Sequence, residues 1–366
     1  MRKLLFLCLL LAFISCKQSP QISHAMYHIP VDSLSTGFPP LAKLSYIPLE
    51  TKDSSLIGSI NKVLFRNHTF YIFDSENKKI FLFDENGKFL QVIERVGQGP
   101  GEYLYPSDMD VDMDGNIYIS DFYAKSVIKY RKGNETDFEI LNIGNSFMDF
   151  AIENEIVYMS RIAKTTTFDI NIARWNNQTK GIEILKENKL PEGNKIPYAN
   201  HYLYRSGNGV CYYERFHPMV YRVTEDSLYE YISFHSEDFP TTDNIKKYNT
   251  LPLEKKYELH TWDVNACYET EKYIILEFYT GMEQTYCLIN KETKEMYRIH
   301  SLPSIGVLGY GIHALAENDF VSFFRSDKGN IKRAISVIPE NDKINRELMR
   351  TVTEDDNPVL VRFSFE

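Results

Sequence analysis

The chain has 366 residues, of which 43% are hydrophobic and 14% aromatic, with 25 Tyr, 23 Phe and 2 Trp. This composition provides ample apolar surface for a folded core and excludes a disordered, collagenous or coiled-coil chain. The formal net charge is −9, and because phosphate binding requires a clustered basic face, no nucleic-acid partner is expected.

The N-terminus has the pattern of an export signal. A short basic head, Met-Arg-Lys at 1–3, precedes an unbroken apolar run at 4–14 and then polar residues. A membrane-spanning helix needs about 20 apolar residues. We therefore expect residues 1–15 to be a cleaved signal peptide, the alternative being a permanent transmembrane anchor.

Residues 13–16, Phe-Ile-Ser-Cys, resemble a bacterial lipobox, in which a small residue precedes a lipidated cysteine. The resemblance implies lipid on Cys16 and a tether over residues 16–42 that holds the chain to a membrane. The resemblance to Gram-negative lipoproteins also implies, from Lys17 in place of an aspartate after the cysteine, an outer-membrane location in the cell envelope. The periplasmic and the surface face both stay open, and the alternative is an ordinary cleavage site near Cys16.

A short cassette of β-forming residues recurs along the rest of the chain. Its six copies are Phe70–Asp74, Ile117–Asp121, Ile156–Ser160, Val210–Glu214, Tyr273–Glu277 and Phe320–Phe324. The spacing between copies is 39 to 63 residues with a mean of 50, which is typical of β-propeller blades. We predict an all-β, six-bladed β-propeller over residues 43–366. The alternatives, a sandwich or two smaller β domains, give no reason for this period.

A propeller ring closes when a terminal strand joins the blade at the other end. We expect residues 44–49 to form the outer strand of the last blade beside residues 359–364. Pro48 suits an outermost edge, where its missing N–H faces solvent. Helical periodicity appears as one modest candidate, at 341–353.

The stretch Gly97–Tyr103, followed by Pro106 and the segment Asp108–Asp121, resembles a family of six-bladed β-propeller lipoproteins of Gram-negative gut-type bacteria. That family is related to NHL-repeat and TolB-like propellers. Further segments match it in the same order, at 48–51, 56–60, 204–207, 237–240 and 356–361. The match runs from Leu44 to Glu366. It implies the propeller fold but says little about activity.

The same resemblance directs attention to histidines, because NHL-type lyases bind a metal near the axis through histidines on innermost strands. His201, His260 and His313 lie at or just before predicted innermost strands, and Arg205 lies in a Tyr-rich stretch of one blade. These four residues are the candidate axial ligand-binding residues. Alignment of the blades places the three histidines at different depths, so we expect hydrogen-bonded polar lining rather than a zinc site, and no cofactor.

Two other motifs admit a functional and a structural interpretation. Gly97–Gly101 lacks a following helix and a Lys-Ser or Lys-Thr pair, so we expect an inter-blade connection rather than a phosphate loop. Asp108, Asp110, Asp112 and Asp114 alternate with apolar residues, which indicates a strand with one polar face rather than a calcium loop. The Tyr residues around Arg205 suit either sugar or peptide stacking or packing between blades.

Cysteine is sparse in the mature chain. Cys211, Cys267 and Cys287 remain once the signal and lipid sites are set aside, and we expect buried, inert thiols, with a Cys267–Cys287 disulfide as the alternative.

Known catalytic motifs, such as a G-x-S-x-G elbow or an H-E-x-x-H pair, do not occur in the sequence. We therefore favour a binding module for a glycan, a peptide or an envelope protein over an enzyme. The alternatives are a lyase or hydrolase acting at the axis and a structural subunit of an envelope complex.

Overall fold

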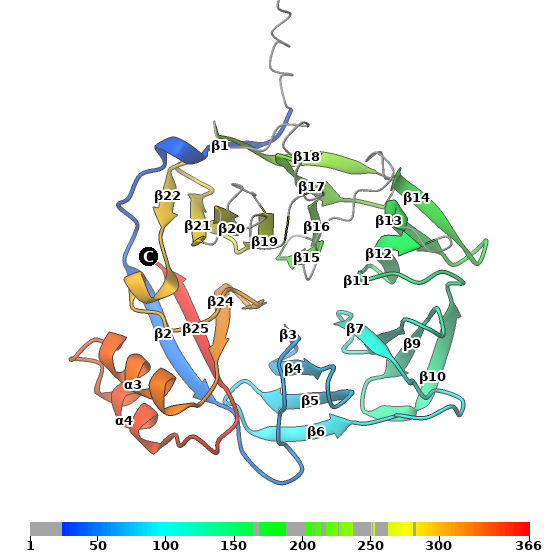
Figure 1. Ribbon diagram of the computed structural model, residues 1–366, viewed down its shortest axis with the longest axis horizontal. Helices are drawn as coiled ribbons and strands as arrows, with labels where there is room; N and C mark the ends of the chain where they lie inside the picture. Colours follow the sequence, from blue (N-terminus) through cyan, green and yellow to red (C-terminus); the bar gives the residue numbers. More distant parts are fainter. Residues whose placement is uncertain are drawn as a thin grey trace, which may run out of the picture.

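The polypeptide forms a ring of β-sheets around a central axis (Figure 1). The computed structural model describes residues 24–163, 168–187, 202–207, 209–213, 217–225, 227–236, 250, 252, 263–280 and 283–366. These residues contain six sheets, five of four strands and one of five, arranged as blades. The prediction of an all-β, six-bladed β-propeller is confirmed.

The blades are numbered in chain order, and their strands are given from the axis outward. Blade 1 contains β3 (Lys62–Arg66), β4 (Thr69–Asp74), β5 (Lys79–Asp84) and β6 (Phe89–Ile93); blade 2 contains β7 (Pro106–Val111), β8 (Ile117–Asp121), β9 (Ser126–Arg131) and β10 (Asn134–Asn142); blade 3 contains β11 (Asp149–Glu153), β12 (Ile156–Ala163), β13 (Phe168–Asn176) and β14 (Gly181–Glu187). Blade 4 contains β15 (Leu203–Ser206), β16 (Gly209–Tyr213), β17 (Met219–Val223), β18 (Leu228–His235) and β1 (Tyr27–Pro30); blade 5 contains β19 (Asp263–Glu269), β20 (Tyr273–Thr280), β21 (Glu283–Asn290) and β22 (Met296–Ile299); blade 6 contains β23 (Ala314–Ala316), β24 (Asp319–Phe324), β25 (Val359–Phe365) and β2 (Leu41–Pro48). The remaining elements are η1 (Val31–Ser33), η2 (Leu302–Ile305), α3 (Lys328–Val337) and α4 (Lys343–Thr351).

Each predicted cassette lies on the second strand of its blade, β4, β8, β12, β16, β20 or β24, except that Glu214 of the fourth cassette lies outside the described residues. A second strand is hydrogen-bonded on both edges and covered by a neighbouring blade on both faces, so both of its alternating sets of side chains are buried. All five residues of β8 are buried, whereas most of the outermost strand β10 is exposed. The cassette is therefore the most conspicuous part of each blade in the sequence.

The ring is closed by the N-terminal strand β2, as predicted. It pairs antiparallel with β25 in blade 6, with Leu44 opposite Phe363 and Pro48 opposite Val359. β2 is the outermost strand of its sheet, so the missing N–H of Pro48 breaks no ladder. Residues from the two ends of the chain thus share one sheet, which holds the ring shut.

A further strand from the N-terminal region extends blade 4. β1 pairs in parallel with the outer edge of β18, and Tyr27, Ile29 and Val31 are 2–3% exposed. The chain then crosses the rim of blade 5, where Ser35 bridges to Tyr297, before it enters β2 (Figure 1). We call residues 24–40 the rim strap. From His24 onward, the segment assigned to a tether therefore lies against the propeller.

Two helices are inserted between β24 and β25 of blade 6. The helix predicted at 341–353 is α4, which begins after Asp342, whose side chain accepts a hydrogen bond from the backbone of the first turn. α3 was not predicted, although Ile331 and Ala334 have helical spacing and Asp327 caps its first turn in the same way. The described part of the chain contains no helix long and apolar enough to cross a membrane.

Aromatic side chains fill the spaces between blades. The twelve largest fully buried side chains of the described residues are all Tyr or Phe. One buried cluster joins Tyr118 and Val127 of blade 2 to Phe150 and Met159 of blade 3. The aromatic surplus of the sequence is thus mainly core packing.

The three cysteines of the propeller are buried free thiols. Cys267 of β19 and Cys287 of β21 both lie opposite Leu276 of the intervening strand β20. Two strand spacings separate them, roughly 9.5 Å. A disulfide requires Cα atoms within about 7 Å, so this geometry excludes the Cys267–Cys287 bridge that the sequence left open.

Candidate functional site: the axial cavity

The innermost strands present one backbone edge toward the axis, and acidic side chains satisfy its N–H groups. Asp108 of β7 accepts a hydrogen bond from the backbone N–H of Phe150 in β11 at 3.0 Å. Asp110 accepts one from the N–H of Ile152 at 2.5 Å. Alternate residues of a strand point the same way, so the spacing of the two carboxylates matches that of the two N–H groups.

The same device links two other pairs of blades. Asp149 of β11 accepts a hydrogen bond from the N–H of Leu203 at 2.8 Å, and Glu277 of β20 accepts one from the N–H of Ile312 at 2.9 Å. Both carboxylates are almost fully buried. Because an unpaired buried N–H is costly, these acids stabilise the junctions between neighbouring blades.

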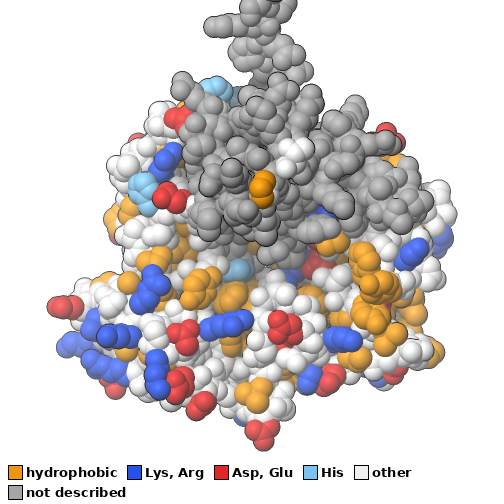
Figure 2. All heavy atoms as spheres, viewed as in Figure 1, with side chains coloured by type: hydrophobic (Ala, Val, Ile, Leu, Met, Phe, Trp, Pro, Cys, Tyr) orange, Lys and Arg blue, Asp and Glu red, His pale blue; other side chains and the backbone are white. Residues whose placement is uncertain are grey.

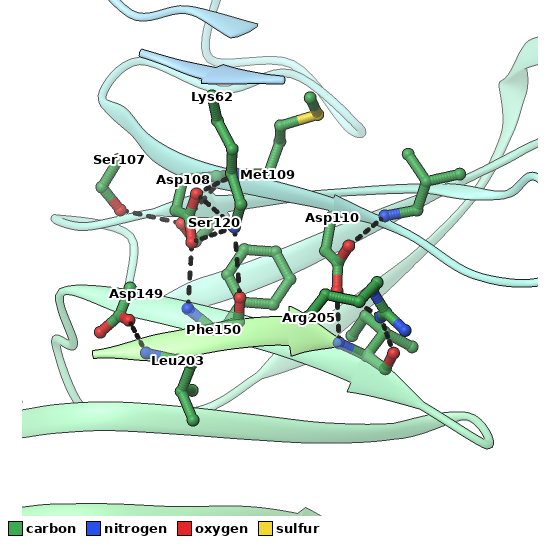
Figure 3. Close-up of polar contacts among 12 residues, drawn as sticks. Lys62, Ser107, Asp108, Met109, Asp110, Ser120, Asp149, Phe150, Leu203 and Arg205 are labelled. Atoms are coloured by element: carbon green, nitrogen blue, oxygen red, sulfur yellow. Dashed lines mark hydrogen bonds and ion pairs between the residues drawn. The ribbon is translucent and has the colours of Figure 1, made fainter. Parts of the chain in front are cut away.

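Two cations pair with the acids of β7 (Figure 3). Lys62 of β3 donates to Asp108 at 2.9 Å. Arg205 of β15 donates to Asp110 at 2.6 Å and to Glu153 at 2.9 Å. The ion pairs join side chains of blades 1, 2, 3 and 4 across the axis and fix their positions.

These groups line a cavity of about 520 Å³ between the innermost strands, which we call the axial cavity. Its walls come from β3, β7, β11, β15 and β23, together with Tyr268 of β19. The charged lining groups are Lys62, Arg66, Asp108, Asp110, Glu153, Arg205 and Glu317.

Of the four predicted axial residues, the structure brings Arg205 and His313 together on the cavity wall. His201 and His260 lie outside the described residues, as does the predicted lipid site Cys16. The described residues contain no group of three or more His, Cys, Asp or Glu side chains placed to hold a metal ion.

His313 is held in place by its neighbours. Its Nε2 lies 2.8 Å from the carbonyl oxygen of Tyr310, and its ring packs on Phe323 with centroids 4.4 Å apart. Tyr268 donates its hydroxyl to the His313 carbonyl at 2.7 Å. Because the Tyr310 carbonyl can only accept a hydrogen bond, its contact with His313 assigns the proton of the ring to Nε2.

The carboxylate of Asp110 is ionised and held in place. Burial by itself would raise its pKa, but the charges of Arg205 and Lys62 outweigh that effect and keep the pKa below its usual range. A group that is ionised, 1% exposed and bonded to a cation and a backbone N–H is a fixed acceptor. It is poorly placed to exchange protons with a substrate.

Sequence reasoning identified the polar face of β7 but not its partners. The alternation from Asp108 to Asp114 indicated a strand with one polar face, and Asp108 and Asp110 do lie on β7, but the strand ends at Val111 and Asp112 and Asp114 belong to the turn that follows. Lys62, Arg66 and Asp149 carried no such signal, because none of them belongs to an alternating polar pattern. Their position on the innermost strand follows from counting back one strand from each cassette.

The Gly-rich connection is also structural, as expected. It leads from blade 1 into β7 with no helix, and the carboxylate of Glu102 accepts a hydrogen bond from the Gly99 N–H at 2.8 Å. A side chain at Gly97 would collide with this carboxylate.

The aromatic residues around Arg205 pack between blades. Tyr202, Tyr204, Tyr212 and Tyr213 are at most 6% exposed, so core packing accounts for them rather than ligand stacking.

Exposed aromatic rings lie instead on blade 2. Tyr105 and Tyr123 are 52% and 69% exposed, and their ring centroids are 4.7 Å apart. The amino group of Lys78 lies 5.2 Å from the Tyr105 ring centroid. Figure 2 shows hydrophobic side chains gathered over this blade, on the right of the view.

Comparison with known proteins agrees with this architecture. The model of a domain of unknown function, DUF4934, matches residues 41–364. The chain belongs to the DUF4934 family. The matched residues run from the first residue of β2 to the penultimate residue of β25, so the family domain is the whole ring. A comparison with the curated proteins finds no match.

Two solved structures share the fold of this DUF4934 chain. One is a protein of Bacteroides fragilis NCTC 9343 described as exported, with 21% identity and a TM-score of 0.72 over 93% of this chain and 99% of the other. The second is a DUF4221 family member from Bacteroides vulgatus ATCC 8482, with 9% identity and a TM-score of 0.53 over 90% and 98%. At these identities the similarity establishes the fold alone.

Proposed function

We propose that this protein is a lipid-anchored β-propeller of the outer membrane that binds a small polar ligand in the axial cavity. A glycan, a peptide or a segment of an envelope protein is the proposed class of ligand. Lipid on Cys16 would provide the anchor, and a relationship to NHL-repeat and TolB-like propellers is part of the same proposal. The similar Bacteroides fragilis protein is described as exported, which agrees with an envelope location.

The observation that carries the proposal is a cavity of ligand size with fixed polar walls. A volume of about 520 Å³ lies in the range of small-molecule sites. Asp108 and Asp110 are each tied to a cation and to a backbone N–H. This arrangement fixes the polar groups of the cavity wall but leaves neither carboxylate free for acid–base chemistry, which favours binding over a lyase or hydrolase.

Thermal denaturation with a panel of neutral oligosaccharides and peptides tests the binding role. A ligand at 100 times its Kd adds about 2.7 kcal/mol, which should raise the Tm by roughly 3 °C or more. Ser75 lines the cavity and the next residue, Glu76, is not among its lining residues. Ser75→Trp should abolish the rise and Glu76→Trp should preserve it. No rise with any ligand, or an equal rise in Ser75→Trp, would contradict the proposal.

The anchor is tested separately by cell fractionation and mass spectrometry of the mature N-terminus. Cys16→Ser should move the protein from the membrane to the soluble fraction, while Cys211→Ser, at a buried thiol, should leave it on the membrane. Retention of Cys16→Ser on the membrane would refute lipid anchoring at this residue.

A further inference from the structure

Arg66 differs from the other two cations of the axial cavity. Lys62 and Arg205 each form an ion pair, whereas no carboxylate of the described residues lies within 4 Å of the Arg66 guanidinium. Its Nη1 donates to the carbonyl oxygen of Phe65 at 2.9 Å, and its buried Nε has no hydrogen-bond partner among the described residues. Most of its five N–H donors therefore have no partner in the described part of the chain.

The surroundings of Arg66 disfavour an unpaired charge. Burial, together with repulsion from Arg205, lowers the pKa of Arg66 to about 10. The group still carries its charge at neutral pH, in partly desolvated surroundings where an anionic acceptor interacts more strongly than in water.

Arg66 lies at the end of the cavity where the innermost strands finish. It is the last residue of β3, and Glu153 is the last residue of β11. Gly207 and Gly209, which follow β15, line the same end, and a Cβ atom added to Gly209 would meet no atom within 4 Å. This end of the cavity thus has unfilled space at Gly209, and the Arg66 guanidinium lines the same cavity.

The negative charges near Arg66 favour a singly charged anion over a doubly charged one. Asp110 and Glu153 interact electrostatically with Arg66 without pairing with it. They would repel a phosphate or sulfate dianion more than a single negative charge. A planar carboxylate carries one charge and matches the geometry of a guanidinium.

We propose that Arg66 binds a carboxylate group of the ligand in the axial cavity. This inference rests on the proposed binding function and adds the ligand's chemical class. It predicts that acidic sugars or peptides with a free carboxylate bind more tightly than their uncharged counterparts.

The test uses matched probes and isothermal titration calorimetry on the mature protein. The probes are glucuronate, acetyl-triglycine and benzoate, each beside its carboxamide, and inorganic phosphate. At least one carboxylate should bind roughly 10-fold or more tightly than its amide, and Arg66→Gln should remove that difference. Arg66→Lys should retain part of it. Arg131→Gln, an equal change of charge at an exposed residue outside the cavity lining, should have no effect.

The outcomes separate this inference from the proposed function. Equal binding of carboxylates and amides, an Arg66→Gln effect under 2-fold, tighter binding of phosphate, or no carboxylate binding at all overturns the role of Arg66. The binding function itself fails if the neutral oligosaccharides and peptides do not bind either, or if Ser75→Trp does not weaken their binding. Circular dichroism and the Tm of Arg66→Gln verify that the variant is folded.

Discussion

Replacement of Asp110 by Asn tests whether the ion pairs around the axis hold the blades together. Asp110 is 1% exposed and is bonded to Arg205 of blade 4 and to the backbone of blade 3. An asparagine keeps an oxygen for the N–H of Ile152 but removes the charge that faces Arg205. Arg205 then retains Glu153 as its partner.

The expected cost follows from this geometry. Removal of one partner from a buried ion pair costs about 3–5 kcal/mol. Because Glu153 still neutralises part of the charge of Arg205, we expect the lower end, about 3 kcal/mol. Arg205→Met in the Asp110→Asn background should recover part of the loss, since no unpaired charge then remains.

Urea denaturation followed by Trp fluorescence measures the free energy of unfolding of each variant. Glu347→Gln is the control, because its pair with Arg350 is exposed and should contribute less than about 1 kcal/mol. A loss below about 1 kcal/mol in Asp110→Asn, or strictly additive effects of the two substitutions, would refute the reasoning.

The stability difference between wild type and Asp110→Asn should change with pH in a direction that the pKa of Asp110 fixes. The pKa of Asp110 is lower in the folded than in the unfolded protein. Its stabilisation is therefore complete above the unfolded value, about 3.9, and is lost as the pH falls through the folded value. The stability difference between wild type and Asp110→Asn should narrow below about pH 4. A difference that widens there would contradict this assignment.

Three further predictions concern the rest of the ring. Ile29→Ala removes a side chain of the rim strap that is 3% exposed and should cost about 2–5 kcal/mol by urea denaturation; a loss under 1 kcal/mol would show that the strap is not held. Glu269→Gln leaves the partly buried cations Arg222 and Lys291 of blades 4 and 5 without this carboxylate and should cost about 3 kcal/mol in the same assay. Cys211, Cys267 and Cys287 should react with a maleimide only after unfolding, and mass spectrometry should find no bridge between Cys267 and Cys287.

The blades could be predicted because each second strand is a short run of β-forming, mostly apolar residues. Tyr71 and Tyr118 lie in runs of β-forming residues whose two faces are both buried. The closing strand could also be predicted, since Pro48 restricts it to a sheet edge. Helix α3 was missed because its amphipathic pattern is weaker than that of α4.

The candidate site was harder to predict than the fold. His313 was assigned to the axis on the resemblance to lyase propellers and Arg205 on its Tyr-rich surroundings, and both line the cavity. Lys62 and Asp149 were missed because their function depends on a partner in another blade. The Lys62–Asp108 pair joins residues 46 positions apart, and no local spacing encodes that contact.

The sequence by itself determined the number of blades and the closure of the ring, because periodic burial leaves a periodic hydrophobic pattern. It also carried the pattern of an export signal and a lipid site at Cys16. Only the tertiary structure decided that the strap before β2 lies on the rim of blades 4 and 5, and which cations of the cavity are paired. Both depend on distances between side chains that are far apart in the chain. Arg66 and Arg205 are each an arginine on an innermost strand, but of these two only Arg205 forms an ion pair with a described residue.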